Sequence, residues 1–268
     1  FGGAVAVNGV SLHAPLGAVT GLIGPNGAGK TTTFNACSGL VRPTRGSISL
    51  GGLDVTHRSA PARARLGLGR TFQRMELYGS MTAYENVALG AESARIGGNP
   101  LRQLIGSRRD RFRVAADTEA AIELCGLGPV RDHRVDGLST GWRRLTELAR
   151  ACAGGYRLLL LDEPSSGLDH RETESVSRIL RSLVEVKHLG ILLVEHDMAL
   201  VMSVCANIFV LDFGVLIFTG TPQQVQADPT VRSAYLGSEE GLEEAQAREE
   251  AAEQGRCRQL DDATAGRS

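Results

Sequence analysis

The sequence predicts an α/β fold in which a parallel β-sheet is interrupted by an inserted helical lobe. Short apolar segments, which predict buried strands, alternate with segments whose apolar residues recur every three to four positions, which predict helices. A change of composition in residues 74–136 breaks this alternation and favours helices alone. Alternating strands and helices are typical of α/β proteins, in which helices cover both faces of the sheet.

We expect residues 1–50 to form strands and turns around one loop and one helix. Short apolar segments predict strands at 4–7, 19–23 and 47–50. A helix-compatible segment at 31–40 follows the second of these strands and is separated from it by a Gly-rich loop.

Residues 74–136 are rich in arginine and alanine. Their pattern predicts helices at 83–93 and 114–125, with a looser segment around 97–99. We interpret this region as a helical insertion within the α/β unit.

The rest of the chain returns to alternating elements. A Leu-Ser cap signal opens a predicted helix at 138–153, and the apolar run at 157–162 predicts a strand buried on both faces of a parallel sheet. Apolar residues at positions i, i+3, i+4, i+7 and i+8 predict an amphipathic helix over 176–184. Two further apolar runs predict buried strands at 191–194 and 207–212.

Length and composition are those of a globular protein with one sizeable core. The chain has 268 residues, of which 42% are apolar. Its longest apolar runs span about four to six residues, whereas a transmembrane helix needs roughly 20. We therefore expect neither a membrane-spanning helix nor a signal peptide.

The cysteines indicate the redox compartment of the protein, and the charge distribution bears on whether it binds nucleic acid. The five cysteines are odd in number, widely spaced and without a C-x-x-C pair, so we expect a reducing cytosol rather than a zinc site or a disulfide framework. The formal net charge is −1, but residues 238–268 alone carry −5, which leaves +4 on the rest. This small and scattered basic excess does not favour nucleic acid as a partner. The acidic segment 238–268 is expected to be a disordered or frayed tail.

The Gly-rich loop after the 19–23 strand carries the pattern G-x-x-x-x-G-K-T, which predicts phosphate binding. Glycines let backbone N–H groups turn toward one anion, and the helix that follows adds its positive end. Lys30 supplies a mobile positive charge for the outer phosphates, and Thr31 offers a hydroxyl group to Mg²⁺. The residues expected to contact the nucleotide here are Gly24, Pro25, Asn26, Gly27, Ala28, Gly29, Lys30, Thr31 and Thr32.

Two acids end the apolar strand at 157–162. Asp162 is placed to hold Mg²⁺ beside Thr31, directly or through water. Glu163 is placed to polarise the attacking water. Gln73, in the segment before the helical insertion, is a further candidate for contact with both the metal and the water.

A third motif, Leu138-Ser139-Thr140-Gly141-Trp142, precedes the helix that leads to the acidic strand. A serine and a glycine at a helix start offer a second, smaller anion site. The order of phosphate loop, glutamine, L-S-x-G, L-L-L-L-D-E-P, S-G-L-D and histidine resembles that of the ATP-binding subunits of ABC transporters. The resemblance covers roughly residues 1–237.

The resemblance implies a P-loop NTPase, RecA-like core formed by 1–73 and 137–237, with an antiparallel β subdomain and a helical subdomain at 74–136. It implies that two subunits, identical or different, close on two ATP molecules and reopen on hydrolysis. Ser139 and Gly141 would cover the γ-phosphate bound by the opposite subunit. Asp169, in Ser165-Ser166-Gly167-Leu168-Asp169, would lie across the dimer interface, and His196 would contact the γ-phosphate.

The resemblance also implies partners and a location. The ATPase would lie peripherally at the cytoplasmic face of the membrane and bind integral-membrane permease subunits, and through them act with a solute-binding protein. A cytoplasmic helix of the permease would dock between the Gln73 loop and the helical lobe.

Finer strings are similar to those of branched-chain amino acid uptake ATPases. They are Gly67-Leu68-Gly69-Arg70-Thr71-Phe72-Gln73, Met81-Thr82-Ala83-Tyr84-Glu85-Asn86-Val87, Val194-Glu195-His196-Asp197-Met198, Gly220-Thr221-Pro222, Asp228-Pro229 and Ala234-Tyr235-Leu236-Gly237. We therefore expect an importer of branched-chain amino acids or related small polar solutes.

Two features depart from the family pattern. Phe1 lies at the distance from Lys30 at which an aromatic residue of the family stacks on adenine, but the strand that normally precedes this aromatic is missing. We interpret the chain as truncated or cut from a longer polypeptide. Trp142 stands where the signature usually ends in glutamine, and its single N–H donor cannot copy the hydrogen bonds of an amide.

Two alternatives stay open at this point. A nucleotide-binding module with weak turnover would fit Trp142 and the missing first strand. A non-transport ABC ATPase, acting in repair or translation, usually has two cassettes or a long coiled coil, and neither is present in this sequence.

Overall fold

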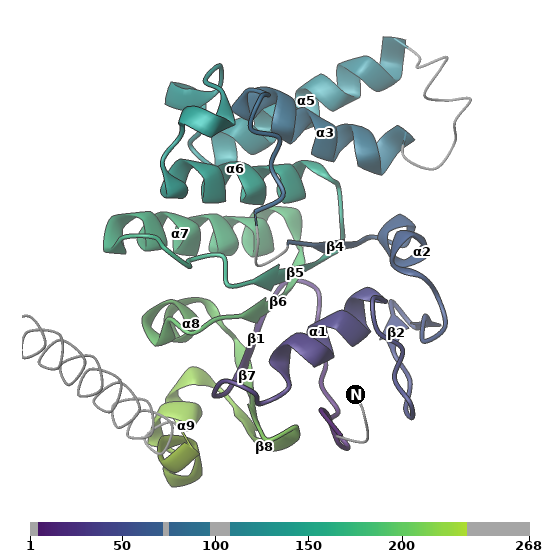
Figure 1. Ribbon diagram of the computed structural model, residues 1–268, viewed down its shortest axis with the longest axis vertical. Coiled ribbons are helices and arrows are strands. Elements are labelled where there is room, and N and C mark those ends of the chain that lie inside the picture. Colours follow the sequence, from purple (N-terminus) through teal and green to yellow (C-terminus); the bar gives the residue numbers. More distant parts are fainter. Residues whose placement is uncertain (1–4, 72–74, 97–107, 235–268) are drawn as a thin grey trace, which may run out of the picture.

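The computed structural model describes residues 5–71, 75–96 and 108–234. Its centre is a six-stranded sheet in which neighbouring strands pair in parallel, except for an antiparallel hairpin at one edge (Figure 1). In spatial order the strands are β4 (Leu68–Arg70), β5 (Leu158–Asp162), β6 (Gly190–Val194), β1 (Val19–Ile23), β7 (Asn207–Asp212) and β8 (Val215–Gly220). The α/β fold and the four predicted strands at 19–23, 157–162, 191–194 and 207–212 are confirmed.

Successive residues of the central strands point to opposite faces of the sheet and enter two separate apolar clusters. One cluster holds Ile23, Leu161 and Leu193, and packs against α7 (His170–Lys187) and α8 (Met198–Val204). The other holds Leu22, Leu160 and Leu192, together with Phe34 of α1 (Lys30–Ser38). Burial on both faces explains why these strands are continuously apolar rather than alternating.

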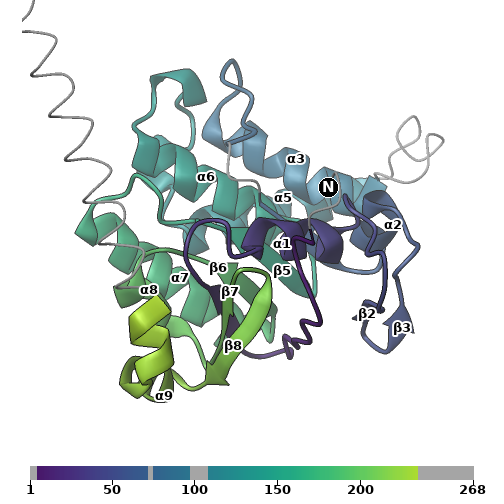
Figure 2. The ribbon, with the colours of Figure 1, turned by 60° about the horizontal axis from the view of Figure 1, so that its bottom comes forward.

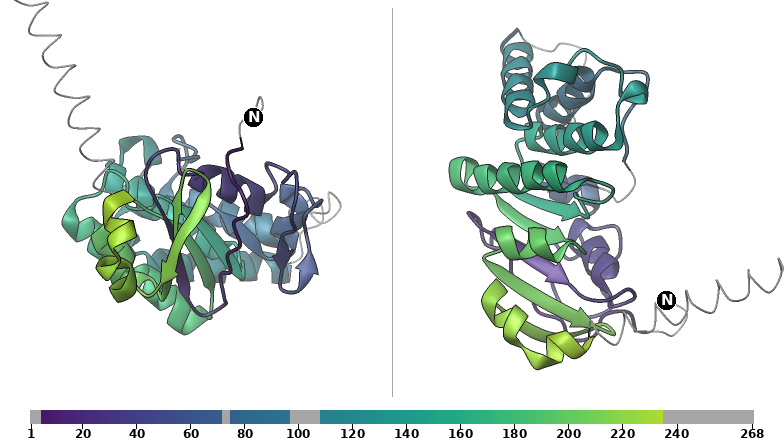
Figure 3. Two further views of the ribbon diagram at one scale, coloured as in Figure 1. Left: turned by 90° about the horizontal axis from the view of Figure 1, so that it is seen from below. Right: turned by 90° about the vertical axis from the view of Figure 1, so that its left-hand side faces the viewer.

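A bundle of α3 (Ala83–Ile96), α5 (Arg108–Leu124) and α6 (Thr140–Ala153) packs beyond α7, and is seen stacked above the sheet in Figure 3. The helices predicted at 83–93, 114–125 and 138–153 are confirmed, and α5 begins six residues before its predicted start. Gly90 permits the close approach of α3 and α6, because a Cβ there would overlap the carbonyl oxygen of Arg150. Two 3₁₀ turns, Gly128–Val130 and Val135–Gly137, lead from α5 to α6.

A small antiparallel hairpin of β2 (Ser49–Leu50) and β3 (Leu53–Asp54) stands beside α2 (Ala60–Arg65) (Figure 2). The side chain of Arg63 is fully buried between this region and α1. Its guanidinium donates hydrogen bonds to the carbonyls of Ala36 and Cys37, each at 2.6 Å. A positive charge at the C-terminal end of a helix satisfies open carbonyls and complements the helix dipole.

The strand predicted at 4–7 is wrong, because residues 5–7 form no strand. The chain there runs beside the β7–β8 turn and makes one backbone hydrogen bond to it, from the Asn8 N–H to the Gly214 carbonyl at 2.7 Å. The strand predicted at 47–50 shortens to β2. Phe1, Gln73 and the tail 238–268 lie outside the described residues.

Within the part of the chain that the structure describes, no helix is both long and apolar enough to cross a membrane. Helix α9 (Pro222–Ala227) begins with a capping box between Thr221 and Gln224, and residues 229–234 are helical again after the break at Asp228.

Candidate active site

The phosphate loop connects β1 to α1 at the carboxyl end of the parallel strands. Gly24, Gly27 and Gly29 have φ values of 150°, 82° and 96°, a region that favours glycine. The surroundings are also tight: a Cβ on Gly24 would overlap the Leu211 carbonyl, and one on Gly29 would lie 2.6 Å from the Ala6 carbonyl. The loop therefore has both the backbone freedom and the close packing that its glycines predict.

Lys30 opens α1 and is almost fully buried. Its ammonium group donates to the carbonyls of Gly24 and Pro25, at 2.7 and 2.9 Å. Burial lowers the pKa of Lys30, while the carboxylates of Glu163 and Asp162 oppose that shift. The lysine thus lies within electrostatic reach of both acids that end β5.

Asp162 is buried at the end of β5 and is held in place by β4. Its N–H donates to the Thr71 hydroxyl at 3.3 Å, and its Oδ2 lies 3.4 Å from the Arg70 guanidinium. Burial raises the pKa of Asp162, Arg70 opposes the shift, and Glu163 adds to it. Arg70 also donates to Asn35 and Ser38 on α1, at 2.8 and 2.7 Å.

The Arg70 guanidinium therefore joins β4, β5 and α1, which is the helix of the phosphate loop. Sequence reasoning did not assign a role to this residue. Thr31, the other predicted metal-binding residue, is exposed in the first turn of α1.

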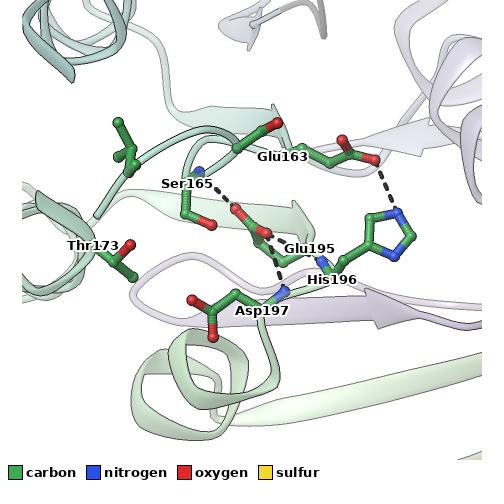
Figure 4. A pocket seen from close by; sticks show the side chains of 8 residues that line it. Glu163, Ser165, Thr173, Glu195, His196 and Asp197 are labelled. Atoms are coloured by element: carbon green, nitrogen blue, oxygen red, sulfur yellow. Dashed lines mark hydrogen bonds and ion pairs between the residues drawn. The ribbon is translucent and has the colours of Figure 1, made fainter. Parts of the chain in front are cut away.

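Glu163 and His196 come together across the ends of two neighbouring strands. Oε1 of Glu163 lies 3.0 Å from Nε2 of His196, as Figure 4 shows. Glu163 adopts a φ of 49°, which is uncommon for a non-glycine residue, and such strained residues cluster at functional sites. A pocket of about 220 Å³ opens beside them and is lined by Glu163, Ser165, Ser166, Leu168, Thr173, Glu195, His196 and Asp197.

Glu195 organises the floor of this pocket. It is buried, its Oε1 accepts the Ser165 N–H at 2.8 Å, and its Oε2 accepts the His196 N–H at 3.1 Å. Burial raises the pKa of Glu195, and these backbone donors oppose the shift. Glu195 was not singled out from the sequence, although it follows the apolar strand 191–194 as directly as Glu163 follows β5.

The start of α6 is built from the L-S-x-G motif. Ser139 is the N-cap, and its hydroxyl accepts the Trp142 N–H at 3.4 Å. The backbone at Gly141 packs against Glu172 of α7, so that a Cβ there would overlap the Glu172 carboxylate. Glu172 and Asp169 in turn form the capping box of α7.

The structure thus brings Lys30, Asp162, Glu163 and His196 to one edge of the sheet. The signature residues Ser139 and Gly141 lie elsewhere: within the described ranges, no hydrogen bond joins them to the phosphate loop 24–31. Trp142 is half-buried, and its side chain packs against the large apolar cluster.

Comparison with known proteins decides the family. The sequence model of the ABC transporter family matches residues 7–166, which is more than half of the chain. The chain belongs to the ABC transporter family. It is an ATP-binding subunit of that family and an ATPase.

A second, shorter family model, described as a branched-chain amino acid ATP-binding cassette transporter, matches residues 215–241 of this ABC protein. Among curated relatives, the high-affinity branched-chain amino acid transport ATP-binding protein BraF of Pseudomonas aeruginosa is 38% identical, over 88% of this chain and 94% of BraF. The corresponding protein LivG of Escherichia coli K12 is 36% identical over the same shares. The lipopolysaccharide export system ATP-binding protein LptB of Acidithiobacillus ferridurans is 37% identical, over 88% of this chain and 92% of LptB.

Solved structures agree with the fold. The ADP conformation of an ATP-binding cassette from an ABC transporter superposes with a TM-score of 0.76 at 27% identity, over 88% of this chain and 94% of that one. A nucleotide-free cassette gives a TM-score of 0.73 at 26% identity, with the same coverage.

Proposed function

We propose that this ATPase powers an ABC importer for branched-chain amino acids or related small polar solutes. The match of residues 215–241 to the branched-chain amino acid family carries the proposal. Overall sequence identity does not separate the importer from the export system, because BraF and LptB are 38% and 37% identical to this chain.

We assign the catalytic roles to the residues gathered at the sheet edge. Lys30 exchanges the carbonyls of Gly24 and Pro25 for the outer phosphates of ATP, which are stronger acceptors for an ammonium group. Glu163 orients and polarises the attacking water, and His196, at 3.0 Å from Glu163, contacts the γ-phosphate from the other side. Gln73, outside the described residues, is proposed to reach the same water.

The Thr31 hydroxyl and the Asp162 carboxylate fit Mg²⁺, because both are hard oxygen donors at the end of the phosphate loop and of β5. Bound there with Gln73, the ion would neutralise charge on the β- and γ-phosphates. Arg70 keeps the Asp162 carboxylate oriented toward the loop.

The separation of the signature residues from the phosphate loop of the same chain supports a site shared by two subunits. Ser139 and Gly141 would cover the γ-phosphate bound by the partner subunit, and Asp169 would lie across the interface. Phe1, outside the described residues, would stack on adenine. The partner subunit is proposed to be a second ATP-binding subunit, identical or homologous.

A pocket of about 270 Å³ supports a membrane partner. It lies where the segment after β4 meets α3 and α6, and is lined by Arg70, Thr71, Tyr78, Leu89, Gly90, Ser93, Glu147, Arg150, Ala151 and Tyr156. We propose that a cytoplasmic helix of the permease docks in this groove, with the ATPase peripheral at the cytoplasmic face of the membrane. A solute-binding protein would act indirectly, through the permease.

The test is reconstitution with candidate permease subunits and a solute-binding protein from the same organism. Vesicles that enclose ATP, with the ATPase facing the lumen and the solute-binding protein outside, should accumulate radiolabelled leucine, and Glu163→Gln should abolish the accumulation. Leucine transport at the level of the Glu163→Gln control would contradict the proposal. Lipopolysaccharide release in a parallel assay would instead assign an export system, and co-purification with ribosomes or DNA a non-transport role.

A module with weak turnover is the second candidate. It is favoured by Trp142, whose half-buried side chain packs against the large apolar cluster and has a single N–H donor in place of an amide. Trp142→Gln should then raise ATP turnover about tenfold or more, the effect of about 1.4 kcal/mol on the barrier. An unchanged rate would leave the full ATPase as the better description.

A further inference from the structure

We propose that Arg144 and Glu147 are positioning residues that connect the groove between α3 and α6 to Ser166, which lines the catalytic pocket. The two side chains lie one turn apart on α6, and neither was singled out by the sequence. The role of the groove in transport rests on the proposed function, but the physical connection is a property of the chain itself.

Arg144 and Glu147 form a buried ion pair. Nη1 of Arg144 lies 3.1 Å from Oε2 of Glu147, and the two side chains are 8% and 6% exposed. Burial raises the pKa of Glu147, and Arg144 opposes that shift. Burying a charge pair costs several kcal/mol per ion unless further hydrogen bonds satisfy it, so the other contacts of the two side chains indicate what the pair holds.

At the groove end, α6 holds the backbone of Glu76. The Arg150 guanidinium donates to the Glu76 carbonyl, and the backbone of Glu76 helps to lower the pKa of Glu147 against the effect of burial. Glu147 and Arg150 both line the groove. An occupant of the groove therefore meets Glu147 directly.

At the catalytic end, Nε of Arg144 donates to the Ser166 carbonyl at 3.5 Å. The Ser166 N–H donates to the Glu163 carbonyl at 3.1 Å, so one short turn joins Ser166 to the proposed catalytic glutamate. The neighbouring Ser165 N–H is bound by Glu195, which also holds His196. A displacement of Arg144 is thus transmitted to the turn that carries Glu163.

The guanidinium group suits this position, because its planar fork binds two partners in different directions with little loss of freedom. A lysine has a single ammonium group and would satisfy either Glu147 or Ser166 well, but not both. The neighbouring Arg143 offers a matched control: it donates to the carbonyls of Val135 and Asp136, at 3.0 and 2.7 Å, away from Ser166.

Hydrogen exchange of the full chain, followed by mass spectrometry without any permease, tests the connection. Arg150→Met releases the Glu76 carbonyl and should speed exchange of the amides of Ser166 and Leu168 about threefold to tenfold, the effect of losing one ordinary hydrogen bond. Arg144→Met should do the same. The double variant should exchange no faster there than Arg144→Met alone.

Strand β7 serves as the internal reference and should keep its protection in every variant, as should the Ser166 turn in Arg143→Met. Unchanged exchange at Ser166 in Arg150→Met, or strictly multiplicative effects in the double variant, would overturn the proposal. If Arg144→Met does not fold, Arg144→Lys replaces it with the same expectation.

Steady-state ATP hydrolysis gives a readout that a purely structural role would not move. Arg144→Lys should lower kcat while leaving KM for ATP within about twofold, because the phosphate loop is untouched. Equal changes in both constants would contradict a positioning role. If no permease stimulates the wild-type ATPase while the exchange pattern is as expected, the proposed function fails and the connection stands.

Discussion

Replacing Gly141 with alanine tests how the start of α6 is packed against α7 within one subunit. Gly141 is buried, and a Cβ there would overlap the carboxylate of Glu172. The same carboxylate accepts the Asp169 N–H at 3.1 Å, while Asp169 accepts the Glu172 N–H at 2.8 Å. The added methyl group must therefore either displace Glu172 from the capping box or strain both helices.

Opposing effects set the magnitude. Alanine favours a helix over glycine by about 0.5–1 kcal/mol. Losing one side of the capping box costs about 0.5–1 kcal/mol, and overpacking costs about 1–3 kcal/mol. The carboxylate is the far end of a flexible side chain and can swing away, so the lost half of the capping box nearly cancels the alanine gain. We expect Gly141→Ala to change the free energy of unfolding by less than about 0.5 kcal/mol. In a Glu172→Ala background the carboxylate is absent, and Gly141→Ala should raise the free energy of unfolding by about 0.5–1 kcal/mol.

Urea unfolding of the four proteins of this cycle, followed by circular dichroism, measures the coupling between the two positions. The control is Gly137→Ala, since a Cβ on Gly137 meets nothing within 4 Å. It should change stability by less than about 0.5 kcal/mol in both backgrounds. If Gly141→Ala has the same effect with and without Glu172, the argued contact is refuted.

Three further predictions follow from the site and its supports. Glu163→Gln should keep ATP binding, measured by equilibrium dialysis, and lose about 10²–10⁴-fold in phosphate release; turnover near wild type would remove Glu163 from catalysis. Arg63→Met should lower the unfolding free energy by about 1–3 kcal/mol, because it removes the charged donor shared by the half-buried carbonyls of Ala36 and Cys37; a thermal shift within error would contradict this. Since burial raises the pKa of Glu147 above its ordinary value of 4.5, its stabilising contribution is complete below that value and is lost as pH rises through the higher folded pKa. Glu147→Gln should therefore flatten the stability–pH curve above pH 4.5, and an unaltered slope would count against the shift.

Most of the sheet could be predicted from the sequence, because its signals are local. Strands β5, β6 and β7 are apolar runs that are buried on both faces, so their bounds follow from composition. The loop glycines were predictable for the same reason, since positive φ is a property of single residues. The strand at 4–7 was predicted wrongly, because apolar residues form a strand only where a neighbouring edge offers a full set of partners.

The supports of the site could not be predicted in this way. Arg70 and Asp162 are 92 residues apart in the sequence and meet only once β4 pairs with β5. The contact of Glu172 with Gly141 depends on how closely α7 approaches α6. Nothing in the local sequence distinguishes Arg144, which bridges to Ser166, from Arg143, which does not.

Asp162 and Glu163, the two successive acids that end β5, carry the same carboxylate group. The backbone conformation at each residue places the two groups in different surroundings. In an extended strand Asp162 and Glu163 would simply point to opposite faces of the sheet. Asp162 keeps that arrangement and is buried beside Arg70. Glu163 instead adopts a φ of 49°, which ends the strand and turns its carboxylate to His196 and the open pocket. This conformation costs of order 1–3 kcal/mol, and it is retained with the Glu163 N–H bonded to Val194 and its carbonyl bonded to Ser166. The backbone turn therefore gives one acid a fixed, charge-paired site beside the phosphate loop and places the other at the pocket, as the proposed activation of a water by Glu163 requires.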